Sequence, residues 1–172
     1  MLLKITEYSK IDERKLMDIY SESNFENTDY FYPNEQNKEK AVLDVESGFL
    51  DYLKNEFFLV KGSTYWVLEE DGMWISALRT NLINPNSHYI EALETRPDKR
   101  RQGYALKLLQ GVIEELKKNG PFNLYACVSK RNEASINAHL KSGFKQAEGD
   151  GYNYLLNAFE PQDYGFEFIY KG

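Results

Sequence analysis

Residues 96–107 combine a high density of positive charge with the start of a helical pattern. The segment has five basic residues and one acid, a local charge of +4 in a chain whose net charge is −6. The basic residues are Arg96, Lys99, Arg100, Arg101 and Lys107. A helix start adds unpaired main-chain N–H groups and the positive end of the helix dipole, and both attract phosphate oxygens. The segment therefore indicates a bound anion, although a solvated basic loop would have the same composition.

Small residues stand where a bulky anion would approach the backbone of this turn. Gly103 has no Cβ and Ala105 has a minimal side chain, while Arg100 and Arg101 supply charge suited to a diphosphate. The segment lacks the Gly-x-x-x-x-Gly-Lys-Ser/Thr pattern of a nucleotide P-loop and the Gly-x-Gly-x-x-Gly pattern of a dinucleotide fold. A glycine in a basic turn between a strand and a helix is, by itself, a weak indication of any one ligand.

Two motifs in this half of the chain resemble those of the GNAT superfamily of N-acetyltransferases. In the first, a proline follows a strand and Arg/Gln-x-x-Gly-x-Gly/Ala opens a helix. The matching residues are Pro97, Arg100, Gly103 and Ala105, with Thr95 in place of the commoner Val. The second motif, one strand later, consists of Asn132, Ser135, His139, Gly143 and Phe144. Two motifs in the expected order and spacing are more specific than either one. The resemblance is strong over residues 89–144, whereas the N-terminal half agrees only in the order of its elements.

The resemblance implies that the chain uses acetyl-CoA as a co-substrate, without a metal, and transfers the acetyl group to an amine. The coenzyme A diphosphate would be held by Arg100, Arg101, Gln102, Gly103, Tyr104 and Ala105. Main-chain groups of Leu93 and Thr95 would pair with the pantetheine arm as if it were an added strand. Asn132 and Ser135 would contact the arm and the adenylate side. A plain helix N-cap at Asn132 and an ordinary helix position at Ser135 are the alternatives.

The transfer requires a base, because alkyl amines have a pKa of about 10.4 and are mostly protonated at neutral pH. The resemblance implies Glu91, since this family often has a carboxylate at that level of the strand. Strand alternation puts Glu91 on one face with Tyr89 and Leu93, and Glu94 on the other. A β-bulge, common in this strand of the family, could reverse the assignment. Glu94 is the second candidate, and an exposed or salt-bridged Glu91 is the structural alternative.

Two further groups would assist the reaction that the resemblance implies. The main-chain N–H of Leu93 would steady the developing oxyanion. The family's usual proton donor to the departing thiolate is a tyrosine at the position of His139, and an imidazole can be donor, acceptor or cation near neutral pH. Tyr152 and Tyr154 are substitute donors. A lone histidine on a helix is otherwise a structural residue.

The apolar pattern along the chain predicts the elements that would position these residues. Strands are predicted over residues 2–8, 64–70, 73–80, 87–95, 122–128, 152–156 and 166–170. Helices are predicted after Asp12, around residues 41–53, from Gly103 to Lys118, and from Asn132 to Gly143. The order predicts one α/β (α+β) domain over residues 1–172. Its central sheet would be mixed and mostly antiparallel, with about six to seven strands and about four helices, as in GNAT proteins.

Residues 21–36 are predicted to form a loop between the first two helices, next to the acceptor site in the resembled fold. The loop contains four acids and no Lys or Arg, together with three adjacent aromatic residues, Tyr30, Phe31 and Tyr32. Acidic and aromatic groups attract cationic amines through Coulomb and cation–π interactions. We therefore expect a small polar amine as acceptor, such as an amino sugar or a polyamine. A solvated acidic loop is the alternative.

Composition restricts the other function classes. A net charge of −6 argues against nucleic-acid binding through phosphate contacts, and the single cysteine excludes an internal disulfide. The absence of an apolar run of transmembrane length and of a signal peptide predicts a cytoplasmic protein without a membrane partner. The aromatic strand Phe166–Tyr170 could extend the sheet to a second copy of the chain, so a homodimer stays open. The rival functions are a non-catalytic sensor that holds coenzyme A or acetyl-CoA, and a structural protein with an accidental basic loop.

Overall fold

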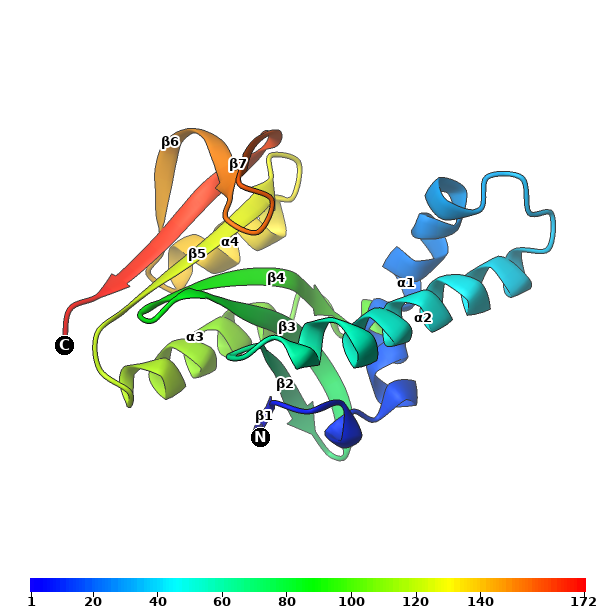
Figure 1. The fold of residues 1–172 in the computed structure, drawn as a ribbon, viewed down its shortest axis with the longest axis horizontal. Coiled ribbons are helices and arrows are strands. Elements are labelled where there is room, and N and C mark those ends of the chain that lie inside the picture. Colours follow the sequence, from blue (N-terminus) through cyan, green and yellow to red (C-terminus); the bar gives the residue numbers. More distant parts are fainter.

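Seven strands form one mixed sheet in the computed structural model, which describes residues 1–172 (Figure 1). Their order is β1-β2-β3-β4-β5-β7-β6, and β4–β5 is the only parallel pair. The strands are β1 (Leu2–Ile5), β2 (Thr64–Glu70), β3 (Met73–Asn84), β4 (Ser87–Thr95), β5 (Phe122–Ser129), β6 (Lys145–Asn153) and β7 (Ala158–Tyr170). The predicted α/β (α+β) class with a mostly antiparallel sheet is confirmed.

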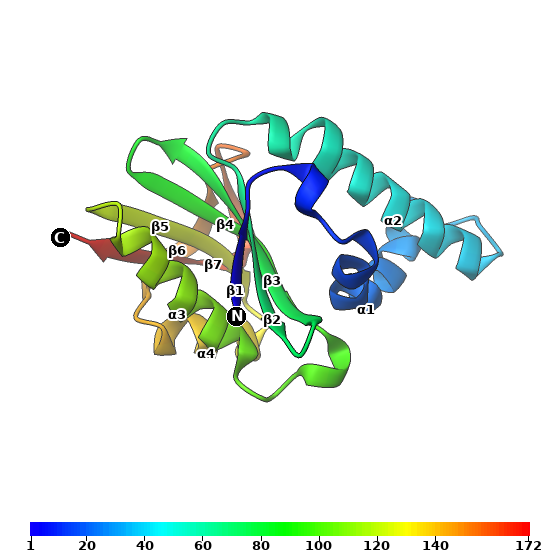
Figure 2. The ribbon, with the colours of Figure 1, turned by 90° about the horizontal axis from the view of Figure 1, so that it is seen from below.

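Four α-helices cover the two faces of the sheet (Figure 2). They are α1 (Glu13–Phe31), α2 (Lys38–Asn55), α3 (Tyr104–Lys117) and α4 (Glu133–Lys141), with single 3-10 turns η1 (Tyr8–Lys10), η2 (Phe57–Leu59) and η3 (Pro97–Lys99). Strand alternation divides the core in two: Tyr65 and Val67 of β2 pack with α1 and α2, whereas Trp66 and Leu68 pack on the side of α3 and α4. None of the helices is both long and apolar enough to cross a membrane.

The prediction of a loop over residues 21–36 is wrong for residues 21–31, because α1 continues through Phe31. Asn24 and Thr28 follow Tyr20 at successive four-residue steps and are buried, with 5% and 0% of their surface exposed. Each of these polar side chains hydrogen-bonds within the helix. Polar residues therefore continue the buried face of α1 beyond the point where the apolar pattern stops, and the hydrophobic period alone ended the helix too early.

The strands at the two ends of the chain also differ from their predicted bounds. β1 ends at Ile5, and the strand predicted at 152–156 instead runs from Lys145 to Asn153. β7 pairs with β5 along residues 163–170 and with β6 as far as Glu167. In the aromatic strand Phe166–Tyr170, only Phe166 and Glu167 are therefore paired on both sides, and residues 168–170 pair with β5 alone. The outermost strands of the sheet are β1 and β6.

The parallel pair β4–β5 separates at one end, and this separation positions the candidate site. The two strands are in register from Ser87↔Asn123 to Ile90↔Ala126 and no further. Beyond Ile90, β4 pairs only with β3, and beyond Ala126, β5 pairs only with β7. Residues 91–95 therefore have one unpaired edge, and that edge runs directly into the basic turn before α3.

Candidate functional site

The turn between β4 and α3 presents a row of unpaired main-chain donors. The first bond of α3 runs from Lys107 N to Gly103 O at 3.0 Å, no side chain caps the helix, and the N–H groups of residues 101–106 have no main-chain partner. Arg101 and Gly103 have φ angles of 62° and 80°. A Cβ built on Gly103 would meet no atom within 4 Å, so the space beside the turn is open. Unpaired donors at the positive end of a helix form an anion site.

The predicted diphosphate residues have different side-chain partners. Arg100 is turned toward α1: its Nη1 lies 2.6 Å from Glu22 Oε2, and its Nη2 lies 3.8 Å from Glu94 Oε1. Arg101 is exposed and has no ion pair. Tyr104 donates a hydrogen bond to Glu70 Oε2 at 2.6 Å, so its hydroxyl is directed at β2. Gln102 is exposed and Ala105 is half-buried against the α3 core. The main chain of this turn, with Arg101 beside it, is therefore the accessible part of the predicted seat.

A bulge in β4 puts both candidate bases on the same face. Three steps along β4, from Glu91 to Glu94, match two steps along β3. Ala92, inside the bulge, has a φ of 51°, and Tyr20 Oη donates a hydrogen bond to its carbonyl oxygen at 2.7 Å. The prediction from simple strand alternation is therefore wrong here. It put the two glutamates on opposite faces and Leu93 on the face of Glu91. Leu93 packs against the core on the side of α3 and α4, and the bulge re-aims the side chains beyond it.

Glu94 and Glu91 have different surroundings on this face. Glu94 accepts a hydrogen bond from Ser23 Oγ at 3.1 Å, and burial raises the pKa of its carboxyl above the usual value despite that bond and the nearby Arg100. Glu91 accepts a hydrogen bond from Asn81 Nδ2 at 2.8 Å and lies 3.6 Å from Arg79 Nη2. Burial therefore makes the Glu94 carboxylate easier to protonate than an ordinary glutamate, a property that suits a proton acceptor.

Arg79 is a residue of this site that the sequence reading did not identify. Its guanidinium lies 5.2–5.6 Å from the ring centroids of Phe49, Tyr52 and Phe57, and its Nε is buried without a partner. Strand alternation in the sequence could have identified this arginine. An arginine two residues after Ala77, in a predicted apolar strand, lies on the buried face by alternation.

A cavity of about 590 Å³ lies between α1, α2 and the bulge of β4. Ala92 and Glu94 line it from the strand, and Arg79 lines it from β3. Its aromatic residues are Tyr20, Phe31, Tyr32, Phe49 and Tyr52. The four acids predicted to face an acceptor, Glu22, Glu26, Asp29 and Glu35, are not among the lining residues, whose carboxylates are Asp44 and Glu94. Of the three predicted aromatic residues, Phe31 and Tyr32 line the cavity and Tyr30 does not, and the acids of the lining come from α2 and β4.

The second motif forms the start and the buried face of α4. Asn132 Oδ1 accepts a hydrogen bond from Ser135 N at 3.0 Å, which confirms the N-cap. His139 is 1% exposed: its Nδ1 lies 2.8 Å from Ser135 O, its ring packs against Phe144 and Phe166, and its Nε2 is buried without a partner. Burial lowers the pKa of His139. The imidazole is therefore neutral at neutral pH and enclosed by protein.

Tyr154 lies where β4 and β5 separate. Its ring stacks on Tyr125 with 4.5 Å between centroids, and the ring of Tyr89 is 6.1 Å away. Tyr89 and Tyr125 are partners in the register, one step before the last pair of β4–β5. Burial raises the pKa of Tyr154, so its hydroxyl keeps its proton at neutral pH. Tyr152 contacts Tyr154 edge to face at 5.0 Å.

The fold resembles several solved N-acetyltransferase structures. The PaiA N-acetyltransferase of Thermoplasma acidophilum, in complex with coenzyme A, has a TM-score of 0.66 and 18% identity, and the match covers 99% of each chain. The ribosomal-protein-S18-alanine N-acetyltransferase of Escherichia coli has a TM-score of 0.62 and 18% identity, over 100% of this chain and 96% of that chain. A mutant of the spermidine N-acetyltransferase SpeG of Vibrio cholerae has a TM-score of 0.62 and 16% identity, and the match covers 98% of this chain and 92% of that chain.

No curated protein matches the chain. A family model described as the acetyltransferase (GNAT) family matches residues 14–144, which is most of the sequence. The matched region includes the bulged strand, the row of unpaired donors and the residues of α4 described above. The chain therefore belongs to the acetyltransferase (GNAT) family and is an N-acetyltransferase.

Proposed function

We propose that the protein transfers the acetyl group of acetyl-CoA to the primary amine of a small molecule, by direct attack in a ternary complex. One observation carries this proposal: the unpaired edge of β4 joins the unpaired donors of the turn before α3, while the cavity lies across the same bulge. A diphosphate and an extended thioester arm need the first two features, and an amine needs the third. The coenzyme A complex of the Thermoplasma acidophilum protein supports the choice of co-substrate.

Each part of the co-substrate is proposed to meet a different group of residues. The N–H groups of residues 101–106 hold the diphosphate, with the side chain of Arg101 and, once it leaves Glu22, that of Arg100. Main-chain groups of Leu93 and Thr95 pair with the pantetheine arm along the open edge of β4. Asn132 and Ser135, at the start of α4, face the arm and the adenylate side. These assignments extend the family pattern to the matching positions of this chain.

The acceptor is proposed to be a small cationic amine in the cavity between α1 and α2. Carboxylates of Asp44 and Glu94 and five aromatic rings line the space, and such groups attract ammonium ions. Arg79 opposes a cation, but Glu91 lies beside its guanidinium and offsets its charge. A volume of about 590 Å³ suits a small molecule. The Vibrio cholerae and Escherichia coli proteins are named for spermidine and a ribosomal protein, so the fold alone does not select the acceptor.

Proton transfer is proposed to run through Glu94. Its carboxylate accepts the ammonium proton, which frees the nitrogen lone pair to attack the thioester carbonyl, and the N–H of Leu93 stabilises the oxyanion. Glu91, the base that the sequence favoured, is the second candidate. His139, the donor implied by the family pattern, reaches the departing thiolate only if its enclosure opens, because Nε2 is buried. Tyr154 is the alternative donor, since it lies beside the strand separation and keeps its proton.

An acceptor panel read by release of the free thiol tests the proposal. Diamines, polyamines and amino sugars should give turnover, and neutral or acidic amines of equal size should give much less. Turnover confined to neutral or acidic amines would contradict the cationic acceptor. If acetyl-CoA protects the protein against heat and no amine or N-terminal peptide releases thiol, the chain is instead a sensor of the cofactor. Absence of any heat protection at millimolar acetyl-CoA would contradict both readings.

A further inference from the structure

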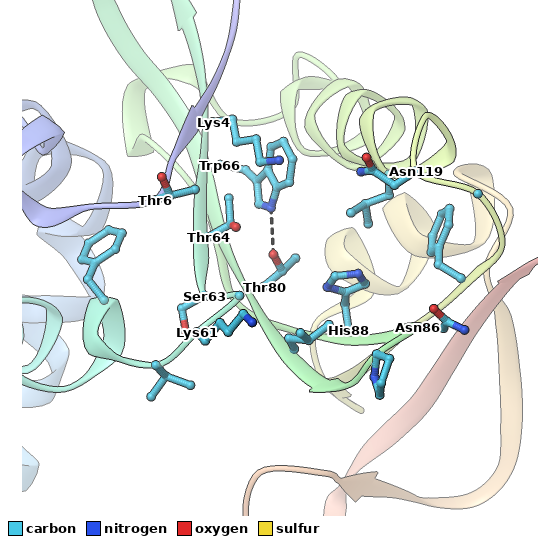
Figure 3. A pocket seen from close by; sticks show the side chains of 18 of the residues that line it. Lys4, Thr6, Lys61, Ser63, Thr64, Trp66, Thr80, Asn86, His88 and Asn119 are labelled. Atoms are coloured by element: carbon cyan, nitrogen blue, oxygen red, sulfur yellow. Dashed lines mark hydrogen bonds between the residues drawn. The ribbon is translucent and has the colours of Figure 1, made fainter.

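Two neighbouring residues of β2 direct buried polar groups to opposite faces of the sheet. Nε1 of Trp66 donates a hydrogen bond to Thr80 Oγ1 of β3 at 2.8 Å, beside a second cavity of about 480 Å³ (Figure 3). Tyr65, on the face of α1 and α2, donates instead to Tyr20 Oη at 2.7 Å. The first bond stays within the sheet, whereas the second links the sheet to α1.

The hydroxyls of Tyr65 and Tyr20 continue to the bulge of β4, because Tyr20 Oη donates to the carbonyl oxygen of Ala92 at 2.7 Å. We call this series, Tyr65–Tyr20–Ala92, the hydroxyl chain. A carbonyl oxygen can only accept, so the proton of Tyr20 is committed to Ala92 and Tyr65 must be the donor to Tyr20. Tyr65 is fully enclosed and Tyr20 is 5% exposed, and burial raises the pKa of both hydroxyls. Both therefore keep their protons at neutral pH, and the hydroxyl chain has one direction.

The hydroxyl chain ends on the peptide unit that contains the proposed oxyanion donor. All peptide bonds of the protein are trans, so the carbonyl oxygen of Ala92 and the N–H of Leu93 point in opposite directions within one plane. A hydrogen bond on that oxygen therefore also aims the N–H of Leu93. Ala92 has a φ of 51°, which is uncommon for a residue with a Cβ, so this conformation requires support from outside the strand.

The N–H of Leu93 points to the open edge of β4. Arg96 N donates to Ile75 O in the segment of β3 beside it at 2.9 Å, and successive N–H groups alternate between the two sides of a strand. The N–H of Leu93, three residues earlier, consequently lies on the side away from β3, where β4 has no partner beyond Ile90. The edge that is proposed to receive the thioester arm therefore includes this donor.

We propose that the hydroxyl chain aims and polarises the N–H of Leu93 for the oxyanion of acetyl transfer, so that Tyr20 and Tyr65 are positioning residues of the reaction. Hydrogen bonds in series strengthen one another, because a group that accepts one bond becomes a stronger donor in the next. Neither hydroxyl has to touch the reacting atoms, since both act through the peptide unit of Ala92 and Leu93. The inference rests on the proposed function, within which it assigns this role.

The first test is the steady-state kinetics of Tyr20→Phe, which keeps the ring in the acceptor cavity and removes only the hydroxyl. With the best acceptor of the panel, kcat should fall about tenfold, which is less than the loss of about 100- to 1,000-fold caused by removing an oxyanion donor itself. The KM values of acetyl-CoA and of the amine should stay nearly the same, because the contacts of the bound substrates are kept. Tyr8→Phe is the matched control: it removes a hydroxyl that donates to Glu13 of α1 at 2.7 Å, outside the site, and should leave kcat unchanged. An unchanged kcat in Tyr20→Phe, or an equal loss in Tyr8→Phe, would overturn the inference.

Tyr65→Phe tests the hydroxyl chain itself. It should lower kcat by a smaller factor than Tyr20→Phe does, because the bond from Tyr20 to Ala92 is kept. In the Tyr20→Phe background it should lower kcat no further, since Tyr65 acts only through Tyr20. Losses that multiply in the double variant would contradict the hydroxyl chain.

A second readout requires no acceptor. The NMR chemical shift of the Leu93 amide nitrogen should change in Tyr20→Phe and change less in Tyr65→Phe, while Tyr8→Phe leaves it as in the wild type. An active wild type whose Leu93 amide does not respond to Tyr20→Phe would contradict this inference alone. A wild type that releases no thiol with any amine would contradict the proposed function, and the role of the hydroxyl chain with it.

Discussion

Arg100 forms an ion pair with Glu22 of α1, with 2.6 Å between Nη1 and Oε2. The arginine that the family pattern assigns to the diphosphate is thus held by a carboxylate outside the turn. About half of each side chain is exposed, so solvent screens the pair. Binding of a diphosphate would have to draw Arg100 away from Glu22, and the ion pair competes with the co-substrate.

Glu22→Gln should therefore tighten coenzyme A binding. An exposed ion pair is worth about 0.2–1 kcal/mol, so the expected decrease in Kd is at most about fivefold, and it should shrink as salt is added. Calorimetric titration with coenzyme A measures it. Glu39→Gln, which removes the same charge from an exposed position of α2, is the matched control and should leave the Kd nearly unchanged. Weaker binding by Glu22→Gln would mean that Glu22 orients Arg100 instead of competing for it.

Gly103→Ala should weaken coenzyme A binding through the backbone and not through a clash. Gly103 has a φ of 80° and an added Cβ would meet no atom within 4 Å, so the substitution costs about 1 kcal/mol of backbone strain. Relief of that strain would rotate the donors of the turn. Gly72→Ala is the control, because Gly72 has a φ of 76° and equally open space in the β2–β3 hairpin. Both variants should lose similar thermal stability, and only Gly103→Ala should raise the Kd of coenzyme A. Equal Kd values in the two variants would count against this use of the turn.

Elements whose pattern is local could be predicted from the sequence. The Asp71-Gly72 hairpin forms with φ values of 51° and 76°, and Asn132 caps α4 as its residue type indicates. These features depend on contacts within a few residues of the chain. The second half of α1 could not be predicted, because its buried face continues with Asn24 and Thr28.

The site depends on contacts that no local pattern contains. The bulge at Ala92 is held by Tyr20, 72 positions earlier in the chain, and it decides the face on which Glu94 lies. Arg100 was assigned to the turn on its charge, but its partner is on α1. The enclosure of His139 comes from Phe144 and Phe166, and the second of these is on β7. The sequence indicates which residues could do chemistry, whereas their direction follows from long-range packing.

Glu94→Gln and Glu91→Gln should separate catalysis from stability. Loss of a general base lowers the rate about 100- to 10,000-fold, so Glu94→Gln should lower kcat by that factor and leave the melting temperature similar or higher. Glu91→Gln removes the carboxylate beside the largely buried Arg79 and should destabilise the fold by about 1–3 kcal/mol, with a smaller effect on kcat. Thiol release and thermal melts measure both. The reverse pattern would assign the base to Glu91.

The decrease of kcat/KM at low pH, the acid limb of the pH profile, should depend on the ionisation of Glu94. Burial raises the pKa of its carboxyl, so the fraction of ionised base, and with it kcat/KM, should fall as the pH decreases toward a value above the usual pKa of 4.5. In Glu94→Gln the residual rate should lose this limb. A limb that persists unchanged in the variant would belong to another group.

His139 should make the fold less stable in acid. Burial lowers its pKa in the folded state below the usual 6.5, so the unfolded chain binds more protons at pH values between the two. The stabilisation is complete above about pH 6.5 and is lost as the pH falls toward the lowered pKa. His139→Phe removes the titrating group and keeps a ring between Phe144 and Phe166. The drop in melting temperature from about pH 8 to about pH 5.5 should be smaller in this variant than in the wild type. His88→Gln, which leaves His139 in place, is the control and should keep the part of the drop that His139 causes. Equal drops in the wild type and in His139→Phe would mean that His139 has the same pKa in the folded and the unfolded chain, and an enclosure loose enough for that would also let it reach the thiolate.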